Sequence, residues 1–490
     1  MKVTTLTIFL TLLCLSTHAK FEWNENCRSA YTAAIDLKFE ISREIIKTEI
    51  LENPENSLVF LIENYIDYLI IQIGEEQSDF EHLKGNKDVR LTVIEKDQTS
   101  SPWQLYSQAE IHIHWSANRL KFGDYIIAAY DIRKAYKLLE KNQQLYPNFL
   151  PNKKSLGLLY CLLGSVPKQY QWILSIAGMN GDLNQGFDLL EKAISKMKKD
   201  PYFSSMLNET QFLYSFLKMN LDNNNDELLK LLDDIKNSDN ILLRFAASRL
   251  ASKTAQNDLA IDILENRDKS ADFYSFLYLE YLTGVGKLNK LNNDCLIHFN
   301  KYLNEFEGQN YKKSTLMRMS WHAYINNDIS AYTKYKREIN TTGALQIDAD
   351  KEAQSYFNSK RLPNKTLLKA RLYFDGGYFS KALDELKQFD KNQNVNVYDE
   401  LDFYYRLGRT HEQLDNTNTA INFYKIALEK GAQKRYFFAA KSALRLALIY
   451  ERNYDYDQAK KYFNKTIELK DHLYEQSIEQ KAKAGLERIN

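Results

Sequence analysis

One helical pattern recurs at a nearly constant spacing in the C-terminal part of the chain. Its marks are three pairs of small residues: Ala370 with Ala382, Gly408 with Ala420, and Ala447 with Ala459. The interval within a pair is always the same, and successive pairs follow each other at almost equal intervals. Small residues let two helices approach closely, and residues three or four positions apart share one helix face. The pattern predicts helical hairpins that stack, because a single hairpin cannot bury its own apolar face.

The stretch 401–428 shows this pattern most clearly. Turn formers at 415–418 separate two runs with helical spacing, Tyr404-x-x-Leu407-Gly408-x-x-His411 and Ala420-x-x-x-Tyr424-x-x-Ala427. The arrangement resembles the tetratricopeptide repeat family, and the resemblance extends over 366–468. It implies an all-α protein, a right-handed superhelical α-solenoid built from tetratricopeptide-like helical hairpins.

The chain outside the regular repeats is also expected to be helical. Glycine and proline are scarce, with 17 and 7 residues among 490, so long helices and few tight turns are expected. Weaker copies of the hairpin pattern occur upstream of the regular repeats, and little periodicity remains at 340–365. We therefore expect an irregular helical-repeat array at 20–345 and a regular array at 346–490 that ends in a capping helix.

Residues 1–19 have the make-up of a secretory signal peptide. Lys2 supplies a positive charge, the stretch 3–15 is apolar or hydroxylic, and Thr17-His18-Ala19 has small residues at the two positions that a signal peptidase reads. The apolar stretch is shorter than the roughly 20 residues that a membrane-spanning helix needs. We expect cleavage after Ala19 and export of the remaining chain to the periplasm or cell envelope.

Residues 150–193 resemble a second group, the inclusion-body clearance and outer-membrane tetratricopeptide proteins of eukaryotes. The shared features are a long apolar helix, a proline-containing break, and a Gly178-x-x-Gly181-Asp182 turn that leads into a Gly186-x-x-Leu-Leu helix. Those proteins are intracellular, whereas this chain carries a signal peptide, so their location is not carried over. Composition and signal together look more like an exported repeat protein of the Bacteroidetes type.

Several classes of function find no support in the sequence. The formal net charge is +1 and the basic runs are short, so no stripe for a nucleic acid backbone is expected. His112 and His114, two positions apart on a helix, would point to nearly opposite faces and could not share a metal. Gly284-x-Gly286 lacks the third glycine of a dinucleotide-binding loop. Because no catalytic motif is present either, we expect no enzymatic activity, no cofactor and no metal.

The first helices of stacked hairpins line a concave surface that can bind a protein or peptide. The residues expected on that surface are Arg371, Tyr405, Arg409, Glu412 and Gln413. Arg371 and Arg409 occupy equivalent repeat positions, so stacking would place them in a small positive ladder. Such a ladder suits a carboxylate terminus or an acidic peptide segment. The alternative is that these residues form the ordinary solvated face of a helix.

Together these features predict a non-enzymatic exported scaffold that binds protein partners in the cell envelope. The alternative function is an envelope glycan- or lipid-binding protein. That function would use the aromatic residues gathered at 146–182, namely Tyr146, Tyr170 and Trp172. Membrane association is compatible with both.

Overall fold

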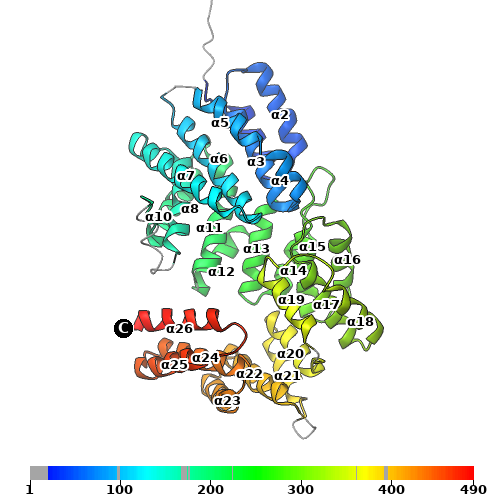
Figure 1. Ribbon diagram of the computed structural model, residues 1–490. Coiled ribbons are helices and arrows are strands. Elements are labelled where there is room, and N and C mark those ends of the chain that lie inside the picture. The colour runs from blue at the N-terminus through cyan, green and yellow to red at the C-terminus, as the bar shows by residue number, and fades with distance from the viewer. Residues whose placement is uncertain are drawn as a thin grey trace, which may run out of the picture. The chain divides into compact units, whose positions relative to one another are not determined.

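The computed structural model describes residues 20–96, 100–166, 174, 177–222, 224–359, 361–390 and 395–489. The predicted signal peptide lies outside these residues, so its cleavage stays a prediction. Within the described ranges the regular elements are all helices (Figure 1), which confirms the predicted all-α fold. None of the described helices is long and apolar enough to cross a lipid bilayer. The chain packs into two compact units.

Unit 1 contains the described residues up to 222 together with Ser238–Leu243 and Asp268–Ser275. Its helices are α1 (Glu25–Ile35), α2 (Phe39–Glu52), α3 (Leu58–Gly74), α4 (Gln77–Leu83), α5 (Asn86–Lys96), α6 (Pro102–Lys121), α7 (Tyr125–Leu145), α8 (Leu150–Gly164), α10 (Leu183–Met197), the short 3-10 helix η1 (Ser204–Met206) and α11 (Leu207–Leu221). Helices α6 and α7 pack against each other as a hairpin, and so do α8 and α10.

Unit 2 contains Asn224–Asn237, Arg244–Arg267 and the described residues from 276 onward. Its helices are α12 (Asn225–Ile235), most of α13 (Ile241–Lys253), α14 (Asn257–Glu265), α15 (Tyr278–Asn289), α16 (Cys295–Glu305), α17 (Lys312–Ile325), α18 (Ile329–Glu338), α19 (Asp348–Asn358), α20 (Lys365–Asp375), α21 (Phe379–Lys387), α22 (Val397–Gln413), α23 (Thr417–Gly431), α24 (Phe438–Arg452), α25 (Tyr456–Glu468) and α26 (Glu475–Ile489). The predicted division at 345 concerns the regularity of the repeats and stays a prediction.

The hairpins of unit 2 turn in the same way at equivalent positions. Gly377, Asp415 and Tyr454 each have a positive φ, of 79°, 58° and 60°. They follow each other at the interval of the sequence repeat. A left-handed residue ends the first helix of each hairpin and lets the chain reverse into the second. At Gly377 a side chain would not fit, because a Cβ would lie 2.4 Å from the carbonyl oxygen of Ala255.

The small residues of the repeat lie where helices touch, as the sequence predicts. Ala420, Ala447 and Ala459 are fully buried. A Cβ on Gly408 would lie 2.7 Å from the ring of Tyr424, so α22 and α23 meet at the distance that only glycine permits. The aromatic rings fill the space between successive hairpins, and Tyr424, Phe438 and Phe463 belong to one continuous core.

Helix α19 interrupts the alternation of hairpins in unit 2. It lies in the stretch with little periodicity and packs along α17, ahead of the next hairpin, α20 and α21. The buried carboxylate of Asp350 attaches α19 to the start of α17, because it accepts hydrogen bonds from the backbone amides of Tyr311 (2.7 Å) and Ser314 (2.9 Å). Burial raises the pKa of Asp350 to about 6. The carboxylate is placed to satisfy amides that the start of a helix leaves unpaired.

Candidate binding groove

A cavity of about 590 Å³ opens on the first helices of the unit 2 hairpins. We call it the unit 2 groove. Side chains of α17, α19, α20 and α22 line it, together with the residues just before α24 and α26. Its walls combine aromatic rings with cations, represented by Trp321, Tyr398, Tyr436, Arg371 and Arg406. Rings and guanidinium groups in one concave site are the usual composition of a peptide-binding surface.

Arg371 lies on this surface but already has an acidic partner. Its guanidinium is 2.6 Å from the carboxylate of Glu352 on α19 and 4.8 Å from the ring centre of Trp321. The attraction of Arg371 lowers the pKa of Glu352 below its ordinary value. The first arginine of the predicted ladder is therefore already paired with a carboxylate of the same chain.

Arg409 occupies the second position and has no acidic partner among the described residues. It is half-buried, and its guanidinium carbon lies 4.0 Å from the ring centre of Phe374. Stacking on a ring holds the planar guanidinium in place and leaves N–H donors at its edge unused. The predicted positive ladder therefore has an available cation at this position.

Lys441 on α24 is a third cation, next to two residues that line the groove, Phe437 and Tyr474. It is half-buried, and its Nζ lies 4.5 Å from the ring centre of Phe437 and 4.9 Å from that of Tyr474. Within the described part of the chain its ammonium forms no ion pair. Burial, together with repulsion from Arg409 and Arg371, lowers the pKa of Lys441 to about 8. The site thus has positive potential that no internal carboxylate fully balances.

The other predicted site residues have different surroundings. Tyr405 is only 8% exposed and packs against Tyr424 and Phe438. Glu412 is also buried; it accepts hydrogen bonds from Tyr424 Oη (2.8 Å) and Arg445 Nε (3.0 Å), which connects α22 with α23 and α24. Gln413 is exposed. Arg371 lines the groove, and Arg409 lies beside it against Phe374, outside the cavity lining. Tyr405 and Glu412 belong to the packing of the helices that carry it.

Sequence reasoning missed Lys441, although a signal was present. Lys441 follows Asp402 at the interval that separates Ala447 from Gly408, so it occupies the equivalent position on the next first helix. Asp402 lines the groove and pairs with Arg406 one turn along α22, at 3.0 Å. Extending the register by one repeat would have placed Lys441 on the same surface.

A buried polar cluster in unit 1 is a second candidate site. Glu110, His114 and Glu209 offer ligand atoms within 4.8 Å of one another, a spacing that could hold a metal ion. The ammonium of Lys154 lies between the two acids, 3.0 Å from Glu110 and 2.6 Å from Glu209. A third bond, of 2.9 Å, joins it to Tyr65 Oη. The ammonium of Lys154 therefore already supplies the positive charge between the two carboxylates of this cluster.

The tautomer of His114 also argues against a metal at this cluster. Asn64 accepts a hydrogen bond from Trp115 Nε1 at 2.9 Å through its Oδ1. Its amide nitrogen must then be the donor to His114 Nδ1, at 2.9 Å. The neutral ring consequently carries its proton on Nε2, the nitrogen that faces Glu110 at 3.7 Å. His112 belongs to a separate network, in which its Nδ1 meets Asp131 at 2.8 Å.

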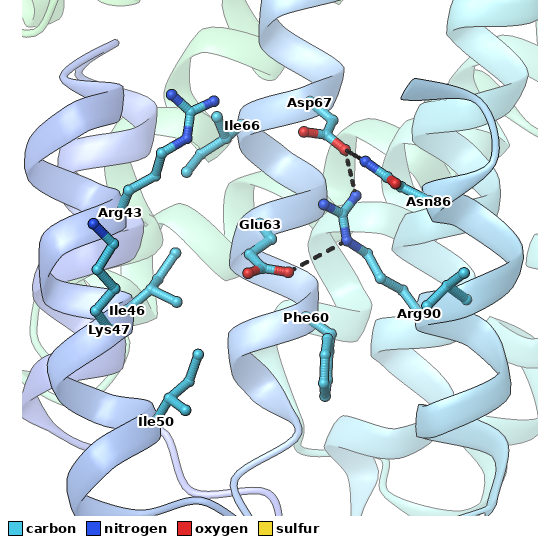
Figure 2. A pocket seen from close by; sticks show the side chains of 11 residues that line it. Arg43, Ile46, Lys47, Ile50, Phe60, Glu63, Ile66, Asp67, Asn86 and Arg90 are labelled. Atoms are coloured by element: carbon cyan, nitrogen blue, oxygen red, sulfur yellow. Dashed lines mark hydrogen bonds and ion pairs between the residues drawn. The ribbon is translucent and has the colours of Figure 1, made fainter. Parts of the chain in front are cut away.

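Unit 1 also has a cavity of about 430 Å³ between α2, α3 and α5, shown in Figure 2. Its walls combine apolar side chains, such as Ile46 and Ile50 on α2, with charged ones. The guanidinium of Arg90 on α5 is neutralised by Asp67 (2.6 Å) and Glu63 (3.6 Å), as the dashed lines in Figure 2 show. Arg43 and Lys47, which also line it, pair with Glu40 (2.5 Å) and Glu44 (2.7 Å) along α2. The cavity therefore lacks the unpaired cations found beside the unit 2 groove.

The aromatic cluster expected at 146–182 is described only in part. Tyr146 is half-buried, and Tyr170 and Trp172 lie outside the described residues. The glycan- or lipid-binding alternative at this segment therefore stays a prediction.

Comparison with known proteins identifies the repeats. The tetratricopeptide repeat profile matches residues 401–429, within the hairpin α22–α23, and residues 440–472, which cover most of the hairpin α24–α25 and the four residues after it. A comparison of structures finds the crystal structure of yeast Tom70, which is 13% identical, with 86% of this chain and 96% of that chain covered and a TM-score of 0.22. A comparison with curated protein sequences finds no match. The profile match shows that the chain carries tetratricopeptide repeats, as its sequence pattern predicts, and such repeats generally mediate protein–protein interactions.

Proposed function

We propose that this chain is a non-enzymatic, exported scaffold that binds a protein partner in the cell envelope through the unit 2 groove. The observation that carries the proposal is the pair of half-buried cations beside the groove, Arg409 and Lys441, without acidic partners among the described residues. Leaving two neighbouring charges uncompensated in a partly dry site costs free energy, and an incoming anion recovers it. The sequence of residues 1–19 supports the export part of the proposal.

The chemistry of the groove favours a carboxylate flanked by apolar side chains. The guanidinium of Arg409, over the ring of Phe374, can donate two parallel N–H groups to one carboxylate, and the ammonium of Lys441 can donate a further bond. The surrounding rings of Tyr398, Tyr436 and Tyr474 can accept the adjoining residues of an extended peptide. A chain terminus or an acidic segment of a partner protein combines both features.

Affinity capture from an envelope extract tests the proposal. The bait is the whole chain, run beside an Arg409→Glu/Lys441→Glu variant. Because hydrogen bonds to charged groups contribute about 1.5–3 kcal/mol each, we expect the double reversal to weaken capture of the protein partner by about 100-fold or more. The matched control, Lys425→Glu/Lys461→Glu, changes the net charge equally on the second helices α23 and α25 and should leave capture unchanged. A partner that the groove variant retains would overturn the proposal.

Binding of the acidic partner is also expected to weaken as the pH rises above 8. The free protein loses the Lys441 proton near a pKa of about 8, because burial and the positive charges of Arg409, Arg371 and Lys481 outweigh the attraction of Glu352. A bound carboxylate raises that pKa, so binding takes up a proton above pH 8 and affinity falls there.

We expect roughly a tenfold loss of affinity between pH 7 and pH 9.5, measured by titration of the purified partner. Lys441→Arg keeps the charge at every pH of this range. That variant should therefore bind with little dependence on pH. An unchanged slope in Lys441→Arg would assign the pH effect to another group.

A further inference from the structure

The exposed face of α7 in unit 1 carries no acidic side chain. Helix α7 (cyan in Figure 1) has two acids, and neither is fully exposed. Asp131 is fully buried and bonded to Lys87 and His112, and Glu140 is half-buried and accepts a hydrogen bond from Tyr160 Oη. The solvent therefore meets only apolar, aromatic and basic side chains along the first four turns of this helix.

The apolar part of this face lies at the tip of the α6–α7 hairpin. Ile126 is 86% exposed, Tyr125 66% and Tyr130 62%, although all three are large hydrophobic side chains. Leu120, from the end of α6, is 48% exposed beside the same turn. Large apolar residues clustered at the exposed start of a helix indicate an interaction surface, because a solvated helix gains nothing from them.

The basic part continues the same stripe toward the C-terminal end of α7. Residues 126, 130, 133, 137 and 141 follow the helical spacing of one face. Arg133, Lys137 and Lys141 are exposed, and the two lysines have no ion pair within the described part of the chain. Arg133 uses only its Nε in an internal bond, to the carbonyl of Ala177 at 2.7 Å. The stripe thus passes from apolar side chains to free cations within about 22 Å, at about 1.5 Å per residue.

We propose that this face of α7 binds the surface of an anionic lipid bilayer. Ile126 and the rings of Tyr125 and Tyr130 would enter the headgroup region, while Arg133, Lys137 and Lys141 contact lipid phosphates. A protein partner of mixed charge would leave this one-sided set of cations unbalanced, whereas an anionic membrane balances all of them. The proposal concerns unit 1 alone and goes beyond the peptide groove of unit 2.

Sedimentation with lipid vesicles tests the proposal, using the whole chain. The vesicles contain phosphatidylcholine mixed with the anionic lipid phosphatidylglycerol, or phosphatidylcholine alone. We expect Lys137→Gln/Lys141→Gln to weaken binding to the anionic vesicles roughly 30-fold, since each cation near such a surface contributes about one factor of five. We expect Ile126→Ser/Tyr130→Ser to weaken it roughly tenfold.

Matched controls separate α7 from other sources of binding. Tyr454→Ser/Tyr456→Ser removes two exposed rings from a hairpin turn of unit 2, and it should bind like the original chain. All variants keep residues 1–19, so any lipid affinity of that segment contributes equally to each. Circular dichroism checks that the helical content is unchanged.

A local probe keeps the proposal falsifiable if residues 1–19 dominate sedimentation. An environment-sensitive fluorophore is attached at Ile126→Cys in a Cys14→Ser background, because the other three cysteines are buried. We expect its emission to shift to the blue with anionic vesicles, and a label at Tyr454→Cys to stay unchanged. No shift at 126, or a concentration-dependent dimer that Ile126→Ser/Tyr130→Ser converts to monomer without any vesicle binding, would overturn the proposal.

Discussion

Replacing Lys154 with methionine is expected to lower the free energy of unfolding of unit 1 by about 3–5 kcal/mol. Methionine keeps the length of the side chain and removes the charge. The lysine side chain is 1% exposed, and the carboxylates of Glu110 and Glu209 that it joins are 3% and 9% exposed. Without the ammonium, two acids remain in a dry site with no cation in contact. A buried charge that loses its partner is among the few causes of so large an effect.

Urea unfolding followed by circular dichroism measures this loss. The control is Lys192→Met, which removes a lysine paired with Asp188 where the two side chains are 61% and 54% exposed. Exposed pairs contribute little, so the control should change stability by less than about 0.5 kcal/mol. A Lys154→Met protein as stable as this control would show that the cluster does not hold unit 1 together.

The same variant is expected to recover part of its stability in mild acid. In the original protein the pKa of Glu209 is already raised, chiefly by burial, and removing Lys154 takes away the main group that opposes this rise. A carboxyl group whose pKa is raised in the folded state stabilises the fold when protonated, and that stabilisation is lost as the pH rises through the raised pKa. The deficit of Lys154→Met should therefore be smaller at pH 5 than at pH 7.

The hairpins of unit 2 could be predicted from the sequence because their determinants are local. The helical spacing, the turn formers at 415–418 and the close approach at Gly408 all lie within one short stretch, 401–428. The repeat strengthens the prediction of a hairpin, because each residue type recurs in the next hairpin at nearly the same interval. The same register contained the information needed to place Lys441 beside the groove.

The Lys154 cluster could not be predicted, because its members are far apart and come from different helices. Lys154 on α8 lies 44 residues from Glu110 on α6 and 55 residues from Glu209 on α11. No spacing rule relates such residues, and an isolated lysine in a helical pattern suggests a solvated face. Glu352, the acidic partner of Arg371, could not be predicted for a similar reason, because it belongs to α19, a helix outside the repeat.

Replacing Gly408 with leucine is expected to destabilise unit 2 by about 3 kcal/mol or more. A Cβ at this position would lie 2.7 Å from two ring atoms of Tyr424, so even alanine requires movement. The ring cannot turn aside, because Tyr424 is fully buried and its hydroxyl is bonded to Glu412 at 2.8 Å. The added side chain must therefore push α22 away from α23.

The control for this substitution is Gly85→Leu, since nothing lies within 4 Å of the place of a Cβ on Gly85. Urea unfolding of the two variants separates the close contact at Gly408 from a general effect of losing glycine. In the double variant Gly408→Leu/Tyr424→Ala the new side chain can occupy the space of the ring. We expect its loss of stability to be smaller than the sum of the two single losses by more than about 1 kcal/mol. Additive losses would contradict a direct contact between these positions.

The single substitution Gly408→Leu is also expected to abolish partner capture at concentrations of urea that leave the original protein folded. Gly408 adjoins Arg409 on α22. One turn further along this helix, Glu412 accepts hydrogen bonds from Tyr424 on α23 and from Arg445 on α24. Moving α22 would therefore displace the stacked guanidinium and the helix that carries Lys441 together. Binding that survives in Gly408→Leu would mean that the cations can be placed without this packing. The close contact that makes the hairpin is thus expected also to fix the spacing of the charges in the groove.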